Sequence, residues 1–181
     1  MILLSLNVRG VGGALKSASM HRLITKVNPD IIFLQETLVA EDKARLFMHK
    51  FVPNCYMCVV SLVGNSGGLL ATWDPNKVTL DPTLCGGGIL LSGVTLETQR
   101  VINLLNVYGP CFERFSFWDR LVSKWMLATK TLIPAEDLNF TTGADKIWGP
   151  VAHLDIHANY FLDLIKDNLL VDLALDVLVP T

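Results

Sequence analysis

The sequence lacks any uninterrupted apolar run of the roughly 18 residues that a membrane-spanning helix needs. Hydrophobic residues make up 51% of its 181 residues, but glycine, serine, asparagine and charged residues break up every apolar stretch. The first residues, MILLSLNVRG, have no basic start, and their apolar run is too short for a secretory signal. We therefore expect an intracellular protein, in the nucleus or the cytoplasm, with no membrane partner.

The chain also lacks an excess of charge of either sign. Its 15 lysines and arginines nearly balance its 17 aspartates and glutamates, for a net charge of -2. This balance argues against a broad basic surface for nucleic acid. A phosphate-bearing partner would have to be held locally, most simply through a metal ion.

Cysteine is scarce, with four in the whole chain. Cys55 and Cys58 form a C-x-x-C pair, but no second cysteine pair or histidine pair completes a metal site. The surrounding residues predict a strand, in which two thiols at this spacing face opposite sides. We expect reduced, buried cysteines and neither a zinc site nor a disulfide.

What is present is an alternation of short strands and helices without repeats or a linker, which predicts a single α/β or α+β domain over residues 1–181. Apolar periodicity and Gly, Pro and Asn turns predict strands and helices along the whole chain. The expected strands are 2–8, 30–37, 56–63, 67–74, 86–97, 100–110 and 130–140, and the expected helices are 17–27, 41–51, 113–128 and 158–170.

Unusual polar residues stand at the carboxyl ends of several predicted strands. They are Asn7, Glu36, Tyr108 and the pair Asp137 and Asn139. Period-2 geometry places Asp137 and Asn139 on the same face of their strand. The plain alternative is that strand ends emerge into water and therefore carry polar residues.

The two carboxylates indicate a cation. Glu36 would share a face with Ile32 and Leu34, and a carboxylate that ends an apolar row is costly unless a cation or several donors compensate its charge. Glu36 and Asp137 come from distant strands and have amides beside them. Such a set favours a hard divalent ion of the Mg²⁺ kind, which takes oxygen ligands.

Five strings in order, LLSLNVRGVGG, PDIIFLQET, SGGLLATW, LLNVYGP and EDLNF, resemble the endonuclease/exonuclease/phosphatase family. The plant non-LTR retrotransposon endonuclease domains are the most similar branch. Each string alone is weak, but five in order are specific. The resemblance implies a four-layer sandwich of two mostly antiparallel β-sheets flanked by helices, with the site in a cleft at one edge.

The resemblance also implies the role of each site residue. Glu36 matches the main metal-ligand glutamate, and Asn7 matches the asparagine beside the metal and the phosphate. Tyr108 matches the tyrosine that supports the scissile phosphate. Asp137 matches the aspartate that orients or deprotonates the attacking water, and Asn139 matches the asparagine that holds the phosphate or its partner histidine. The implied cofactor is Mg²⁺, with Mn²⁺ as an alternative, and the implied substrate is DNA.

The chain departs from the family pattern in three places. Glu136 stands where the family has glycine, and Leu6 where tryptophan is common. The family also continues beyond a segment like VDLALDVLVPT with strands that carry an aspartate and a Ser-Asp-His motif. We therefore expect a domain incomplete at the C-terminus that lacks the last strands, with reduced activity and with self-association through an uncovered sheet edge.

Two hypotheses stay open from the sequence. The first is a Mg²⁺-dependent phosphodiester hydrolase, a DNA endonuclease-like domain of retrotransposon origin that truncation impairs. The second is a non-catalytic relic that keeps residual metal or partner binding.

Overall fold

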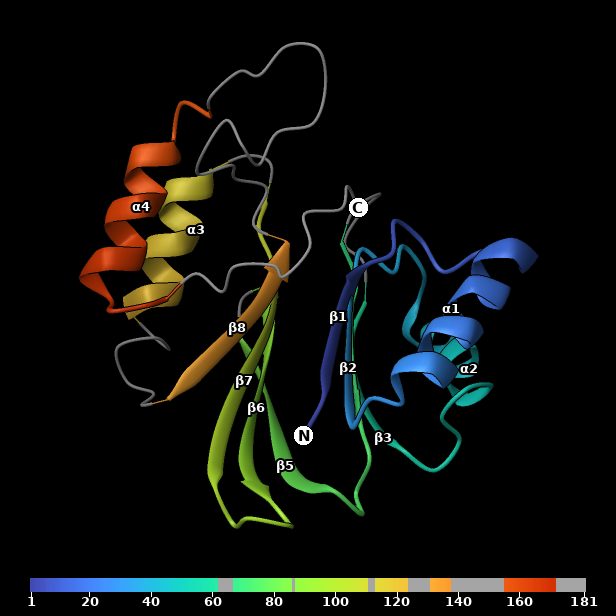
Figure 1. Ribbon diagram of the computed structural model, residues 1–181. Helices are drawn as coiled ribbons and strands as arrows, with labels where there is room; N and C mark the ends of the chain where they lie inside the picture. The colour runs from blue at the N-terminus through green and yellow to red at the C-terminus, as the bar shows by residue number, and fades with distance from the viewer. Residues whose placement is uncertain (62–66, 86, 111–112, 124–130, 138–154, 172–181) are drawn as a thin grey trace.

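The computed structural model describes residues 1–61, 67–85, 87–110, 113–123, 131–137 and 155–171. In this part of the chain two four-stranded sheets lie face to face, and helices cover the outer face of each (Figure 1). This is the four-layer sandwich that the family resemblance implied. The elements in chain order are β1 (Leu3–Asn7), α1 (Ala14–Val27), β2 (Ile31–Gln35), α2 (Glu41–His49), β3 (Tyr56–Val60), β4 (Leu69–Trp73), β5 (Val78–Cys85), β6 (Gly88–Thr95), β7 (Val101–Tyr108), α3 (Arg114–Leu121), β8 (Leu132–Asp137) and α4 (Ala158–Asp167).

The first sheet has the strand order β1-β2-β4-β3. β1 and β2 are parallel, whereas β4 is antiparallel to both β2 and β3. Every residue of β2 and of β4 is buried. Helices cover one face of these strands and the second sheet covers the other, which is why β2 has no polar face. The expectation of a strand covered on both sides is confirmed.

The second sheet has the strand order β5-β6-β7-β8. β5, β6 and β7 form antiparallel pairs, whereas β7 and β8 are parallel. The sequence did not predict β5, because Asp81 and Pro82 interrupt its apolar pattern. β5 lies at the edge of the described sheet, where a strand tolerates proline because one side of its backbone has no strand partner.

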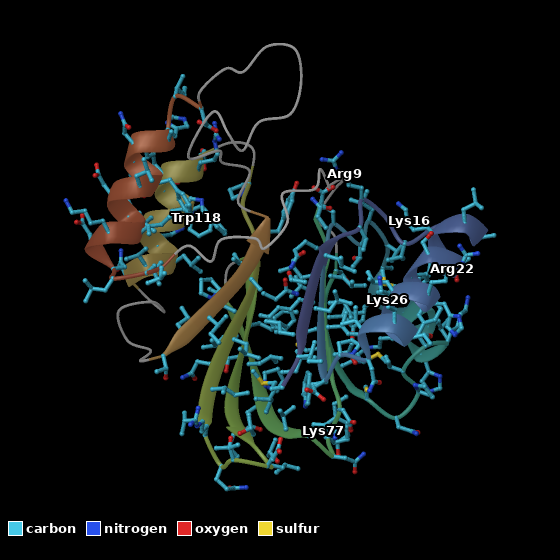
Figure 2. All side chains as sticks on the ribbon, viewed as in Figure 1. Arg9, Lys16, Arg22, Lys26, Lys77 and Trp118 are labelled. Carbon is cyan, nitrogen blue, oxygen red and sulfur yellow. The ribbon has the colours of Figure 1, made fainter. Side chains whose placement is uncertain are left out.

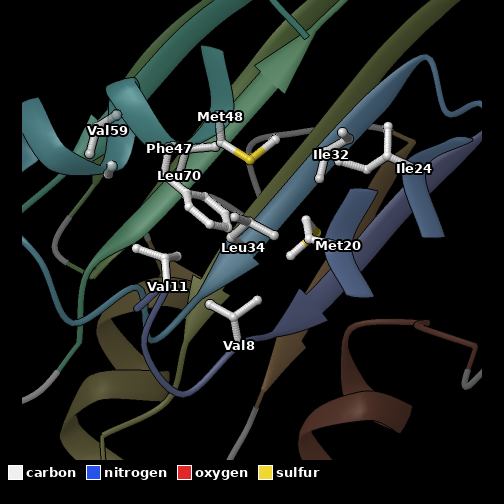
Figure 3. Close-up of a cluster of buried hydrophobic side chains, with 11 residues drawn as sticks. Val8, Val11, Met20, Ile24, Ile32, Leu34, Phe47, Met48, Val59 and Leu70 are labelled. Carbon is white, nitrogen blue, oxygen red and sulfur yellow. The ribbon is translucent and has the colours of Figure 1, made fainter. Parts of the chain in front are cut away.

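Three apolar clusters hold the layers together. One lies between the first sheet and helices α1 and α2, where Met20 and Ile24 of α1 and Phe47 and Met48 of α2 pack with Ile32 and Leu34 of β2 (Figure 3). The second fills the space between the two sheets. The third packs α3 and α4 on the outer face of the second sheet. The helical spacing of apolar residues predicted these helices because that spacing forms the buried stripe of each.

The predicted last helix is too long. Its inward positions Phe161 and Leu164 are buried, as expected. Leu169, also expected to face inward, is 89% exposed, because α4 ends at Asp167 and Leu169 has a left-handed backbone with φ 54°. None of the helices described here combines the length and the apolar composition that crossing a bilayer requires.

Candidate active site

Asn7 and Glu36 meet at the carboxyl ends of the parallel strands β1 and β2. Asn7 Nδ2 donates a hydrogen bond of 3.0 Å to Glu36 Oε1. The backbone N–H of Arg9 donates to Asn7 Oδ1 at 3.1 Å. Because an N–H group needs an acceptor, this second bond assigns the oxygen of the Asn7 amide to Arg9 and its nitrogen to Glu36. Asn7 therefore orients the Glu36 carboxylate.

Glu36 has an uncommon backbone conformation. It lies one residue beyond β2, with φ 53° in the left-handed region, which costs energy for any residue except glycine. The alternation of β2 consequently stops at Gln35. The expectation that Glu36 extends the face of Ile32 and Leu34 is wrong for this reason, and its side chain is half-buried.

Backbone hydrogen bonds hold the residues around Glu36 in place. The parallel pairing of β1 and β2 continues past both strands into the loops that follow. Its bonds are Val8 N to Gln35 O at 3.0 Å, Gly10 N to Glu36 O at 2.6 Å and Val11 N to Thr37 O at 3.1 Å, and Thr37 N donates to Gly68 O at 3.1 Å. The surrounding loops thus fix the unfavourable conformation of Glu36.

Lys16 stabilises the same loop from the first turn of α1. Its ammonium group donates three hydrogen bonds, to the carbonyl oxygens of Val8 at 2.8 Å, Arg9 at 2.9 Å and Gly10 at 2.8 Å. An ammonium group has three N–H donors, so all of them are used. Sequence reasoning missed this lysine, because nothing in its local pattern distinguishes it from a solvated residue.

Tyr108 and Asp137 lie at the strand ends of the second sheet. They are the last residues of β7 and β8, and the parallel register pairs them directly. Tyr108 is half-buried and packs against the cluster between the sheets. The side chain of Asp137 and the whole of Asn139 lie outside the described residues.

A hydrogen bond joins the first sheet to the second close to these strand ends. Gln35, at the end of β2, donates from Nε2 to Oδ1 of Asn106 in β7 at 2.7 Å. Asn106 lies two residues before Tyr108 and pairs with Ala135 of β8. The arrowheads of β1 and β8 accordingly lie at one end of the sandwich (Figure 1). Arg9 lies at this end and Lys77 at the opposite one (Figure 2).

The sequence singled out the strand ends of the candidate site but not the two amides that join the sheets beside them. Gln35 and Asn106 are 1% and 0% exposed. A signal for both was available, since Gln35 ends the apolar run IIFLQ and Asn106 interrupts the apolar residues Leu104, Leu105 and Val107 of VINLLNVY. The hydrogen bond between them could not be predicted from the sequence, because they are 71 residues apart in the chain.

The oxygen donors at this edge suit a hard divalent cation. No group of three or more His, Cys, Asp or Glu side chains gathers within the described residues. Glu36 nevertheless offers a carboxylate that Asn7 holds on one oxygen, while its second oxygen has no hydrogen-bond partner in the part of the chain that the structure describes. Mg²⁺ typically uses one or two carboxylates together with waters and substrate phosphates, so Glu36 fits this ion.

The C-x-x-C pair consists of two separate thiols in the part of the chain that the structure describes. Cys55 and Cys58 are free thiols, both half-buried, and Cys55 lies just before β3 instead of within it. Burial raises the pKa of both thiols. A raised pKa keeps a thiol protonated at neutral pH and therefore weakly reactive.

Comparison with known proteins shows similarity in structure. No family model and no curated protein sequence matches the chain. The AP endonuclease LMAP from Leishmania major superimposes with a TM-score of 0.68 at 14% identity, over 92% of this chain and 66% of that one. The endonuclease domain of TRAS1, a telomere-specific non-LTR retrotransposon, gives 0.63 at 12% identity, over 92% and 69%.

The catalytic domain of human Nocturnin is also similar, with a TM-score of 0.62 at 15% identity. The match covers 78% of this chain and 64% of the Nocturnin chain. The chain thus spans about two thirds of the length of these structures. At these identities the similarity shows the fold, which is that of the endonuclease/exonuclease/phosphatase proteins.

Proposed function

We propose that the chain is a divalent-metal-dependent phosphodiester hydrolase that acts on DNA, a DNA endonuclease-like domain of retrotransposon origin. The observation that carries the proposal is the Asn7–Glu36 hydrogen bond at the edge where β1, β2, β7 and β8 end. The nuclease fold and the five sequence strings give further support, and the similarity to the TRAS1 endonuclease domain favours the proposed origin.

In this proposal Glu36 would hold Mg²⁺, or Mn²⁺ in its place, and the ion would supply positive charge against the phosphate. Asn7 fixes the Glu36 carboxylate and stands beside metal and phosphate. Tyr108 donates from its hydroxyl group to the scissile phosphate. Asp137 aligns the attacking water and accepts its proton, and Asn139 holds the phosphate.

Nicking of supercoiled plasmid tests the proposal. With Mg²⁺ the chain is expected to relax the plasmid, and EDTA should abolish the reaction. Glu36→Gln keeps the size of the side chain but removes its charge, so the nicking rate should fall on the order of 100-fold or more, equivalent to several kcal/mol of lost transition-state stabilisation.

Glu97→Gln is the matched control, because Glu97 is an exposed glutamate in the turn that follows β6. It should nick at the rate of the unaltered chain. Nicking that is equal in Glu36→Gln and Glu97→Gln, or that persists in EDTA, would contradict the proposal.

A further inference from the structure

Two buried amides link the sheets beside the candidate site. Gln35 Nε2 donates to Asn106 Oδ1 at 2.7 Å and to Ser5 Oγ at 3.0 Å. Asn106 Nδ2 donates in turn to the carbonyl oxygen of Leu70 at 3.0 Å. The network therefore joins β1, β2 and β4 of the first sheet to β7 of the second. We refer to the Gln35–Asn106 hydrogen bond as the inter-sheet bridge.

The orientation of both amides follows from their partners. The Leu70 oxygen can only accept, so it must face the nitrogen of Asn106. The oxygen of Asn106 then faces Gln35, which donates to it. Each of the three bonds joins an amide N–H to an oxygen acceptor, which fixes the bridge in one arrangement.

Packing alone does not require these amides at this place. The other residues between the sheets are mostly large apolar side chains, including Ile31, Phe33 and Leu104. Burial of an amide in such surroundings costs free energy that hydrogen bonds only offset, whereas an apolar pair of similar size would pack without that cost. The bridge therefore provides something that apolar contacts lack, which is direction. Apolar contacts between sheets are non-directional and tolerate small shifts of one sheet against the other. A hydrogen bond of 2.7 Å depends on distance and angle, so the same shift weakens it.

The bridge lies where such a shift would matter most. Gln35 is covalently bonded to Glu36, and Asn106 lies two residues before Tyr108 on the same face of β7. Tyr108 pairs with Asp137. A displacement of one sheet against the other at this edge would separate Glu36 from Tyr108 and from the end of β8.

We propose that Gln35 and Asn106 are positioning residues, which hold the two sheets so that Glu36 acts together with Tyr108 and Asp137 on one phosphodiester. This inference rests on the proposed function for its catalytic consequence, but the positioning itself can be measured without it. Neither residue is proposed to touch the substrate or the metal.

The double variant Gln35→Leu with Asn106→Leu tests the inference. It replaces both amides by apolar side chains, so the directional bond is lost. The donors to Ser5 Oγ and to the Leu70 carbonyl oxygen are lost as well, so the unfolding midpoint should fall and is measured beside kcat. In plasmid nicking we expect kcat to fall on the order of 10- to 100-fold. KM should change by less than about twofold, because the residues do not bind substrate. Thr72→Val is the matched control, since it removes another buried polar group of the first sheet away from the bridge, and it should nick normally.

The swapped variant Gln35→Asn with Asn106→Gln keeps the combined length of the two side chains and should restore most of kcat. It also covers the case in which the double leucine variant does not fold. Normal kcat in the double leucine variant, or no difference between it and the swapped variant, would overturn the inference.

Amide relaxation dispersion separates this inference from the proposed function. In the double leucine variant, microsecond-to-millisecond exchange should appear at Glu36, Thr37, Val107 and Tyr108 and be absent from the unaltered chain and from Thr72→Val. If the unaltered chain nicks no plasmid, the proposed function fails, and the dispersion result alone decides the inference. Equal dispersion in all variants would refute the positioning role whatever the nicking result.

Discussion

Arg9 and Glu36 have left-handed backbones with φ 44° and 53°, although neither is a glycine. Such conformations persist where the surroundings over-determine them, and they concentrate at functional sites. Around Glu36 the loop hydrogen bonds supply this restraint, and around Arg9 the Lys16 ammonium does. The Asn7–Glu36 pair thus depends on residues that do not themselves take part in the proposed chemistry.

Lys16→Met should destabilise the protein by about 1–3 kcal/mol, because three carbonyl oxygens lose a charged donor. Denaturant unfolding measures the change, and hydrogen exchange should accelerate at the amides of Gly10 and Val11. Lys26→Met, an exposed position near the end of the same helix, serves as the control. Equal unfolding midpoints for Lys16→Met and Lys26→Met would show that the three bonds contribute nothing.

The candidate site residues Asn7, Glu36, Tyr108 and Asp137 could be singled out because each is a polar residue at or next to the end of an apolar strand. Lys16, Gln35 and Asn106 could not be assigned a partner. A hydrogen bond between residues far apart in the chain leaves no local pattern, and only the folded chain brings its two ends together.

Among the elements, α3 and α4 cover the second sheet, and an ion pair joins α3 to the residues that precede α4. Arg114 at the start of α3 donates from Nη1 to Asp155 Oδ2 at 2.7 Å, and His157 N donates to Asp155 Oδ1 at 2.9 Å. Burial favours the protonated form of Asp155, but the bonds from His157 and Arg114 and the charge of Arg114 outweigh it. The pKa of Asp155 is therefore lower than its ordinary value.

A lowered pKa gives stability that is present above the pKa of the unfolded chain, about 3.9, and lost as the pH falls through the pKa of the folded state. Asp155→Asn should therefore lower the free energy of unfolding at pH 7 by about 1–3 kcal/mol. The difference from the unaltered chain should shrink as the pH drops below about 4. Thermal unfolding across pH measures this, with Asp81→Asn at an exposed position of β5 as the control. A difference independent of pH would contradict the assignment.

Most elements could be predicted from apolar periodicity, since α1, α2, β2, β4 and β7 bury the stripes or runs that their sequences show. β5 was missed because its proline is acceptable only at a sheet edge, and edge position is a property of the assembled sheet. The end of α4 was misplaced because Leu169 continues the apolar spacing after the backbone has left the helix.

At the scale of the whole molecule, the cluster between the sheets leads us to propose that residues 1–181 form one folding unit.

The exposed edges of the sheets decide whether a second copy of the chain can pair with them. The predicted self-association through an uncovered edge stays a prediction, but β3, at one edge of the first sheet, is partly protected. Arg45 donates from Nη1 to the Met57 oxygen at 3.1 Å and pairs with Glu41 at 2.7 Å. Charged groups on an edge strand hinder pairing with a second chain.

Arg45→Ala should increase self-association, because it uncovers the Met57 carbonyl beside two exposed apolar side chains, Leu46 at 66% and Tyr56 at 62%. Sedimentation velocity over a range of concentrations measures the effect. Lys77→Ala removes one exposed positive charge elsewhere and is the control. Identical sedimentation of both variants would show that the Arg45 contact does not hinder pairing of β3 with a second chain.

The sequence by itself determined the alternation of strands and helices, the apolar faces that pack into a sandwich, and the strand ends at which carboxylates and amides appear. These follow from local periodicity, which is a property of neighbouring residues. Only the tertiary structure decided that Asn7 donates a hydrogen bond to Glu36 and that the backbone of Glu36 is left-handed. It also decided that the Gln35 and Asn106 amides form a hydrogen bond between the sheets at that edge. Those contacts join residues tens of positions apart, so they exist only once the layers have packed.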